Sequence, residues 1–209
     1  MLIQELAAEI HRNAVEHGWW EEDRSVYEVL ALIHSEWSEA LEEARAGRPL
    51  AYIEAETSFC PGIESHREII TRGEDGKYIY DGREYSGQPE GVAVELIDGV
   101  IRILDYLGHL GAEFVNPDNG LFSTVDELCE DQTILDPTPA KVPDVVTYLH
   151  RFTSDVLPDE GDECDVSCLM AAMNLAMVWV RQNGMDPVAL LMEKHDFNKG
   201  RTYKHGKKF

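Results

Sequence analysis

The chain has 209 residues, 44% of them hydrophobic, and a formal net charge of −22. This content is typical of a globular chain that buries a core, which excludes general disorder. So large an excess of acid repels nucleic-acid phosphates and anionic lipid, so we expect neither a nucleic-acid nor a membrane partner. The chain starts with early charges and has no apolar run of membrane-spanning length, so we expect no signal peptide and a cytoplasmic protein.

The first part of the chain predicts two helices. Residues 3–17 carry apolar side chains at helical spacing, and Gly18 ends that pattern. Ser25, followed three residues later by Glu28, forms a capping-box pattern for a second helix that ends at about Arg45.

Residues 50–90 interrupt the helical pattern. Asp81-Gly82 lies between two Tyr-containing runs, which predicts a type I′ hairpin turn. Helical patterns then return at about 91–110, 123–131, 143–156, 163–183 and 186–199, with Asp186 as an N-cap. We therefore expect one all-α domain over residues 1–209. It would be a helical bundle with an insertion at about 50–90, which carries a small β-hairpin, and a loop-rich segment at about 111–142.

The cysteines favour no zinc site. There are four, and they form no CxxC pair. Reduced thiols are the simplest reading for Cys60, Cys129, Cys164 and Cys168.

Two pairs of carboxylates stand out on the predicted helices. Glu95 and Asp98 are three residues apart on a helix that is otherwise apolar on most sides, so they lie at the edge of a core. Glu36 and Glu39 have the same spacing on the second helix. Two such pairs facing each other would bind a hard cation, and oxygen ligands favour Mg²⁺ or Mn²⁺ over zinc.

Simpler explanations exist for each pair. The chain has 40 acidic residues, so i,i+3 pairs are frequent. Arg102 is placed to form an ordinary ion pair with Asp98 or Glu95, and Glu39 has the position of a solvated side chain. Spacing alone therefore leaves both readings open.

The charge changes sign near the end of the chain. Residues 194–209 contain six basic side chains and one acid, a formal charge of +5 against −27 for the rest.

These motifs resemble those of the MazG-like, all-α nucleoside triphosphate pyrophosphohydrolases. The family's ExxE and ExxD motifs read Glu36-Trp37-Ser38-Glu39 and Glu95-Leu96-Ile97-Asp98, and the flanks of both are similar as well. The run 194–203 is similar to the family's closing Asn/Lys/Arg segment. The resemblance covers about two thirds of the chain and leaves out much of 50–90 and 111–142.

The resemblance implies a MazG-like helical fold and Mg²⁺-dependent cleavage of a nucleoside triphosphate into a monophosphate and pyrophosphate. Glu36, Glu39, Glu95 and Asp98 would be the metal ligands and catalytic residues, and one of them or Glu43 would orient the water. Candidates for substrate binding are Asn198, Lys199, Arg201 and Trp19. Because enzymes of this family are typically oligomeric, the resemblance further implies a homodimer or homotetramer.

Other readings remain open at this point. A phosphoribosyl-ATP pyrophosphohydrolase would use the same kind of metal-carboxylate site. A non-catalytic acidic binding protein, such as a DNA mimic, would spread its acids over one solvent-exposed face. A purely structural bundle would lose nothing measurable when Glu95 is replaced by Gln.

Overall fold

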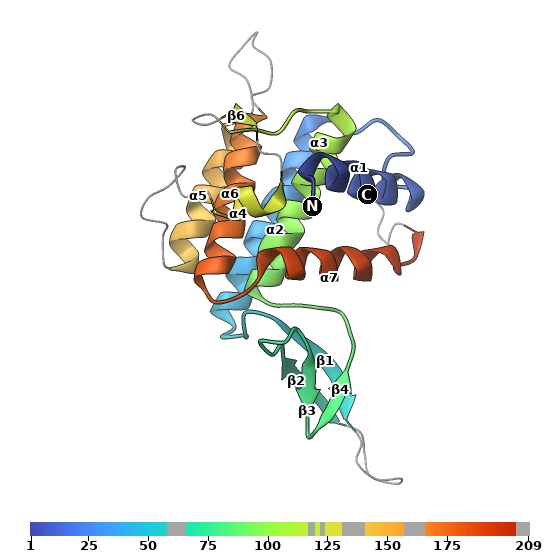
Figure 1. Ribbon diagram of the computed structural model, residues 1–209, viewed down its shortest axis with the longest axis vertical. Helices are drawn as coiled ribbons and strands as arrows, with labels where there is room; N and C mark the ends of the chain where they lie inside the picture. The colour runs from blue at the N-terminus through green and yellow to red at the C-terminus, as the bar shows by residue number, and fades with distance from the viewer. Residues whose placement is uncertain (58–65, 117–119, 122–123, 131–140, 157–165, 204–209) are drawn as a thin grey trace.

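A computed structural model describes residues 1–57, 66–116, 120–121, 124–130, 141–156 and 166–203 (Figure 1). Cys60, Cys164 and the basic residues beyond 203 lie outside these ranges, so the structure does not test what the sequence predicts for them. Among the described helices, none is both long and apolar enough to cross a membrane.

The described part of the chain is mainly helical, with three short antiparallel strand pairs, which confirms the helical class and the presence of a hairpin. The helices are α1 (Ile3–Glu16), α2 (Val26–Arg45), α3 (Val92–Leu110), α4 (Val125–Glu130), α5 (Val142–Ser154), α6 (Ser167–Gln182) and α7 (Pro187–Lys199). The strands are β1 (Tyr52–Thr57), β2 (His66–Thr71), β3 (Tyr78–Tyr80), β4 (Arg83–Tyr85), β5 (Val115–Asn116) and β6 (Gly120–Leu121).

Helix α3 is the central element. It packs against α1, α2, α6 and α7, and Figure 1 shows it beside α2 and α6, with α1 and α7 crossing on its other side. Its side chains are buried around most of the helix, as its apolar sequence predicts. The carboxylates that it carries are therefore held at the edge of the main core.

Helices α2 and α3 approach each other closely at Gly99. A methyl group there would overlap the ring of Trp37, so only glycine permits this spacing. Trp37 is fully buried, and its Nε1 donates to Thr153 Oγ1 on α5 at 3.0 Å. The Trp37 ring, which packs directly on Gly99, thus sets the spacing of α2 and α3. The hydrogen bond to Thr153 on α5 holds the ring in this orientation.

Local sequence signals explain where several elements begin and turn. Ser25 and Glu28 form the predicted reciprocal capping box, and the Asp186 side chain caps α7. Asp81 and Gly82 both have positive φ, at 47° and 71°, as a type I′ turn requires, and they join β3 to β4.

The insertion at 50–90 contains more β-structure than the sequence predicts. Besides the β3–β4 hairpin, β1 pairs with β2, and the strands extend from one end of the helical group (Figure 1). Their small core is Ile53, Ile70 and Tyr78. Arg72 and Tyr78 both bond to Glu193 of α7, at 2.8 and 2.7 Å. These two hydrogen bonds attach the strands to α7.

Candidate metal centre and its cleft

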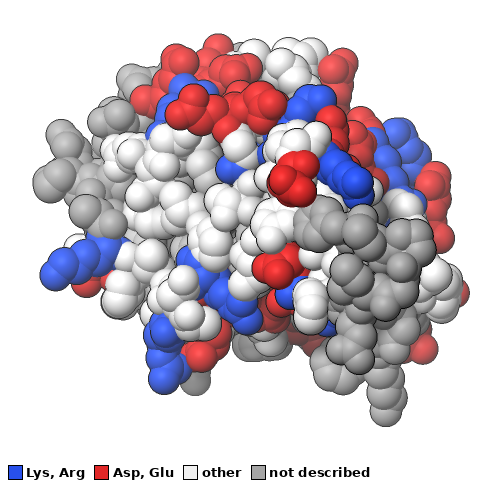
Figure 2. Space-filling model, turned by 90° about the horizontal axis from the view of Figure 1, so that it is seen from below, with Lys and Arg blue, Asp and Glu red and all other residues white. Residues whose placement is uncertain are grey.

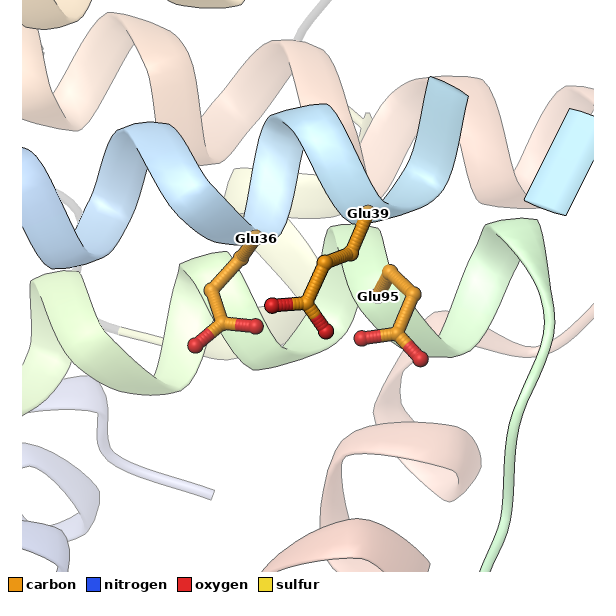
Figure 3. Close-up of side chains that lie close together, drawn as sticks. All are labelled: Glu36, Glu39 and Glu95. Carbon is orange, nitrogen blue, oxygen red and sulfur yellow. The ribbon is translucent and has the colours of Figure 1, made fainter. Parts of the chain in front are cut away.

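Three carboxylates from two packed helices converge. Glu36, Glu39 and Glu95 each offer an oxygen within 4.8 Å of the others. Figure 3 shows Glu36 and Glu39 descending from α2 toward Glu95 on α3, with the three carboxylates side by side. Glu36 and Glu95 are only 6% and 9% exposed, whereas Glu39 is exposed. The arrangement places oxygen ligands at the surface end of a buried seam, where an ion can enter.

The environment disfavours negative charge on the two buried members. Burial, followed by the charge of Asp98, raises the pKa of Glu95 from 4.5 to about 8. Burial also raises the pKa of Glu36, with Asp98 and Glu39 adding to the effect and Arg102 opposing it. Burial is the main reason that ionisation of these two carboxyl groups is disfavoured, and the neighbouring acids add to it; a bound cation would favour the ionised forms.

Two cationic side chains reach into the acidic cluster. Arg102 Nε donates to Glu36 Oε1 at 2.6 Å, so its ion pair is with the facing helix and not with Asp98 or Glu95 on its own helix. Lys194, 2% exposed, lies 2.9 Å from Asp98 Oδ2 and donates to the carbonyl oxygen of Pro89 at 3.0 Å. The ion pair expected between Arg102 and Asp98 or Glu95 is therefore not formed among the described residues; Arg102 pairs with Glu36, and Asp98 pairs with Lys194.

The carboxylates form one end of a longer cleft, called here the carboxylate end. Glu36, Glu39, Glu95 and Asp98 line it together with Lys194. The other lining residues come from α1, the α1–α2 connection, α3, α7 and the chain after α7. They include Asn13, His17, Trp19, Arg24, Arg102, Asp105, Asn198 and Arg201.

Two guanidinium groups mark this second end, called here the arginine end: those of Arg24 and Arg102. The Arg24 guanidinium lies over the Trp19 ring, 5.2 Å from its centroid. Burial, and then the positive charge of Arg102, lower the pKa of Arg24. The two groups are therefore close enough to repel each other.

The predicted substrate-binding residues divide into two groups. Asn198, Arg201 and Trp19 line the cleft. The Asn198 Oδ1 atom is buried without a hydrogen-bond partner, which suits a side chain that meets a ligand. Lys199 is placed differently: it lies outside the cleft lining, and its Nζ pairs with Glu9 at 2.7 Å and Asp196 at 3.1 Å.

Glu43, considered for orienting the water, lies outside the cleft lining. Its Oε2 accepts a hydrogen bond from the Tyr52 hydroxyl at 3.0 Å. Tyr52 is buried, and its hydroxyl pKa is raised by burial and then by this bond, so the hydroxyl keeps its proton. Glu43 thus connects α2 to β1 through this hydrogen bond.

Sequence reasoning missed three cleft residues. Lys194 had been counted only as part of a basic tail, although a lysine inside the periodic pattern of α7 could have signalled a buried position. Arg24 lies in a short connection without a motif. Asp105 belongs to no motif. Its carboxylate accepts bonds from Trp20 Nε1 at 2.9 and 3.1 Å, and His11 Nδ1 lies 2.8 Å away.

Comparison with protein-family models, curated proteins and solved structures gave no match for this chain. The functional argument therefore depends on the geometry of the cleft and on the sequence motifs.

Proposed function

We propose that this chain is a Mg²⁺-dependent nucleoside triphosphate pyrophosphohydrolase, for which Mn²⁺ is an alternative metal. The observation that carries the proposal is the cluster of Glu36, Glu39 and Glu95 in a cleft that is also lined by Arg24, Arg102 and Arg201. A metal–triphosphate complex has the complementary polarity, because its cation would face the carboxylates and its anionic oxygens would face the guanidinium groups. The resemblance of the two acidic motifs to those of the MazG-like enzymes supports cleavage between the α and β phosphates.

The donor set suits a hard divalent cation. It consists of carboxylate oxygens, which Mg²⁺ and Mn²⁺ prefer, and the nearest described nitrogen groups are cationic and therefore not ligands. Glu36, Glu39 and Glu95 would hold the cation, and Asp98, kept in place by Lys194, would complete the set. When bound, such a cation polarises phosphoryl oxygens and lowers the pKa of a coordinated water.

The protein groups would then divide the remaining work. Hydrolysis adds one water across the α–β anhydride bond, and a cleft carboxylate would accept a proton from that water. The seam between α2 and α3 would keep the carboxylates from separating, because Trp37 packs directly on Gly99.

The test is pyrophosphate release from the full chain. It would be incubated with Mg²⁺ and a panel of ribo- and deoxyribonucleoside triphosphates, with phosphoribosyl-ATP as a further substrate. We expect a triphosphate to yield pyrophosphate and a monophosphate. Orthophosphate without pyrophosphate would exclude α–β cleavage, and activity on phosphoribosyl-ATP alone would replace the proposed substrate class.

Matched variants test the site. Glu36→Gln and Asp98→Asn should each lower the rate by at least the roughly 10–100-fold typical of changes around a metal site. Glu42→Gln is the control, since Glu42 lies on α2 outside the cleft lining and pairs with Arg45. Full activity in both cleft variants would remove the assignment.

A further inference from the structure

The arginine end contains an electrostatic arrangement that metal binding leaves unexplained. Within the described chain, Arg24 forms no salt bridge, and the contact made by its guanidinium is with the Trp19 ring. It is half-buried and close enough to Arg102 for that charge to lower its pKa. The nearby carboxylates of Asp105 and Glu28 favour the Arg24 charge, but they do not offset burial and the charge of Arg102, since the pKa of Arg24 is lowered. An anion between the two guanidinium groups would relieve this repulsion.

Arg102 has donors to spare for such an anion. Its Nε is bonded to Glu36, and the described residues include no partner for its two terminal nitrogens. The side chain is 30% exposed and lines the cleft. One guanidinium can therefore contact the acidic cluster through Nε and offer its outer edge to a ligand.

Other charged residues line the cleft near Arg24 and Arg102. Asp105 also lines this part of the cleft, but its carboxylate is engaged by Trp20 and His11. Arg201 adds a third guanidinium side chain to the lining, and its carbonyl oxygen lies 3.0 Å from His17 Nε2, which ties the chain after α7 to the end of α1. Positive charge thus comes from three separate segments, and Asp105 offsets part of it.

We infer that Arg24 and Arg102 form a phosphate-binding subsite for a polyphosphate anion whose bound cation lies at the carboxylate end. Guanidinium groups bind phosphate oxygens through paired N–H donors, and Trp19 would hold Arg24 in the orientation needed. The position of a triphosphate in the cleft depends on the proposed function. The binding of an anion by Arg24 and Arg102 can be tested without catalysis.

Inorganic pyrophosphate is the probe. Its binding to the full-length chain would be measured by calorimetry in Mg²⁺ and again in EDTA, for the wild type and Arg24→Gln. We expect Arg24→Gln to weaken pyrophosphate binding in Mg²⁺ by about 10-fold or more, the scale of a lost charge-assisted contact. Circular dichroism and thermal unfolding would verify that the variant is folded.

Arg48→Gln is the matched control. Arg48 also lies over an aromatic ring, that of Tyr52 at 5.8 Å, but it is exposed and outside the cleft. Its replacement should change pyrophosphate affinity less than twofold. Equal binding by the Arg24→Gln and Arg48→Gln variants, or no binding to the wild type, would overturn the inference.

The outcomes separate this inference from the proposed function. Pyrophosphate binding that is lost in Arg24→Gln, in a protein that cleaves no triphosphate, would support the anion site and reject the enzyme activity. Triphosphate cleavage with unchanged KM and pyrophosphate affinity in Arg24→Gln would support the activity and reject the anion site. Arg102→Gln is a second variant, but it also releases Glu36, so Arg24→Gln decides.

Discussion

The two ends of the cleft are built in different ways. The carboxylate end is carried by α2 and α3, and its side chains are positioned by the same core contacts that join the two helices. The arginine end combines one side chain of α3 with residues from the α1–α2 connection and from the chain after α7. Regular packing therefore determines the spacing of the acids, whereas contacts between connecting segments determine the positions of Arg24 and Arg201.

The ends also differ in how their charge is balanced. At the carboxylate end, Arg102 and Lys194 neutralise part of the negative charge, and the pKa of Glu95 remains raised. At the arginine end, Arg24 forms no salt bridge within the described chain, and its pKa is lowered even though Asp105 and Glu28 favour its charge. Surface charge elsewhere follows neither arrangement: Figure 2 shows acids gathered along one edge of the face seen from below, with basic side chains among them. The cleft is thus locally polarised within a strongly acidic protein.

The largest effect is expected at Lys194. Lys194→Met keeps most of the buried volume but leaves Asp98 and the Pro89 carbonyl without their donor. We expect the free energy of unfolding to fall by about 3 kcal/mol, the scale for removing one partner of a buried ion pair. Urea unfolding in EDTA measures this.

The control for Lys194 lies on the same helix. Lys199 is 39% exposed and pairs with Glu9 and Asp196, so Lys199→Met should cost at most about 1 kcal/mol. Equal losses in the two variants would mean that the internal cation does not stabilise the carboxylate end.

The contrast between these two lysines shows what could be predicted from sequence. Both belong to one basic run, and only distant contacts separate them: Lys194 meets Asp98 and Pro89, about a hundred residues earlier in the chain. By contrast, the pairs Glu36/Glu39 and Glu95/Asp98 could be recognised from i,i+3 spacing, which is local to one helix. The spacing could not show that Glu95 joins the α2 pair while Asp98 pairs with Lys194, because that depends on contacts between helices. Arg24 could not be found in this way, since a short connection has no periodicity.

The fold also contains elements that neighbouring residues determine and elements that distant contacts determine. The capping box at Ser25 and the turn at Asp81-Gly82 depend on neighbouring residues, and both are present as predicted. The β1–β2 pair was missed because Tyr52–Thr57 and His66–Thr71 are short, mix charged with apolar residues, and are stabilised by pairing across an intervening segment. Helix boundaries come from local signals, whereas these strands depend on a partner.

A smaller effect is expected from pH at Glu95. Its folded pKa of about 8 lies above its ordinary 4.5, so between these values the folded state binds more protons than the unfolded state. The stability contributed by the protonated group is complete below about pH 4.5 and is lost as the pH rises toward 8, at up to about 1.4 kcal/mol per unit.

Urea unfolding in EDTA at several pH values measures that slope. Glu95→Gln should remove this component, and saturating Mg²⁺ should flatten it in the wild type, because the cation replaces the proton. Unchanged slopes in the variant would show that Glu95 is not the group carrying the charge imbalance.

The smallest effect concerns Trp19, which supports Arg24 at the arginine end. A cation–π contact at a partly exposed site contributes about 0.5–1 kcal/mol, so Trp19→Leu should weaken pyrophosphate binding in Mg²⁺ by about two- to fivefold. Trp19→Phe keeps an aromatic face and should lose less than Trp19→Leu. Calorimetry under the conditions used for Arg24→Gln makes the comparison. If Leu and Phe weaken binding equally, the ring does not orient Arg24, and the arginine end depends on charge alone.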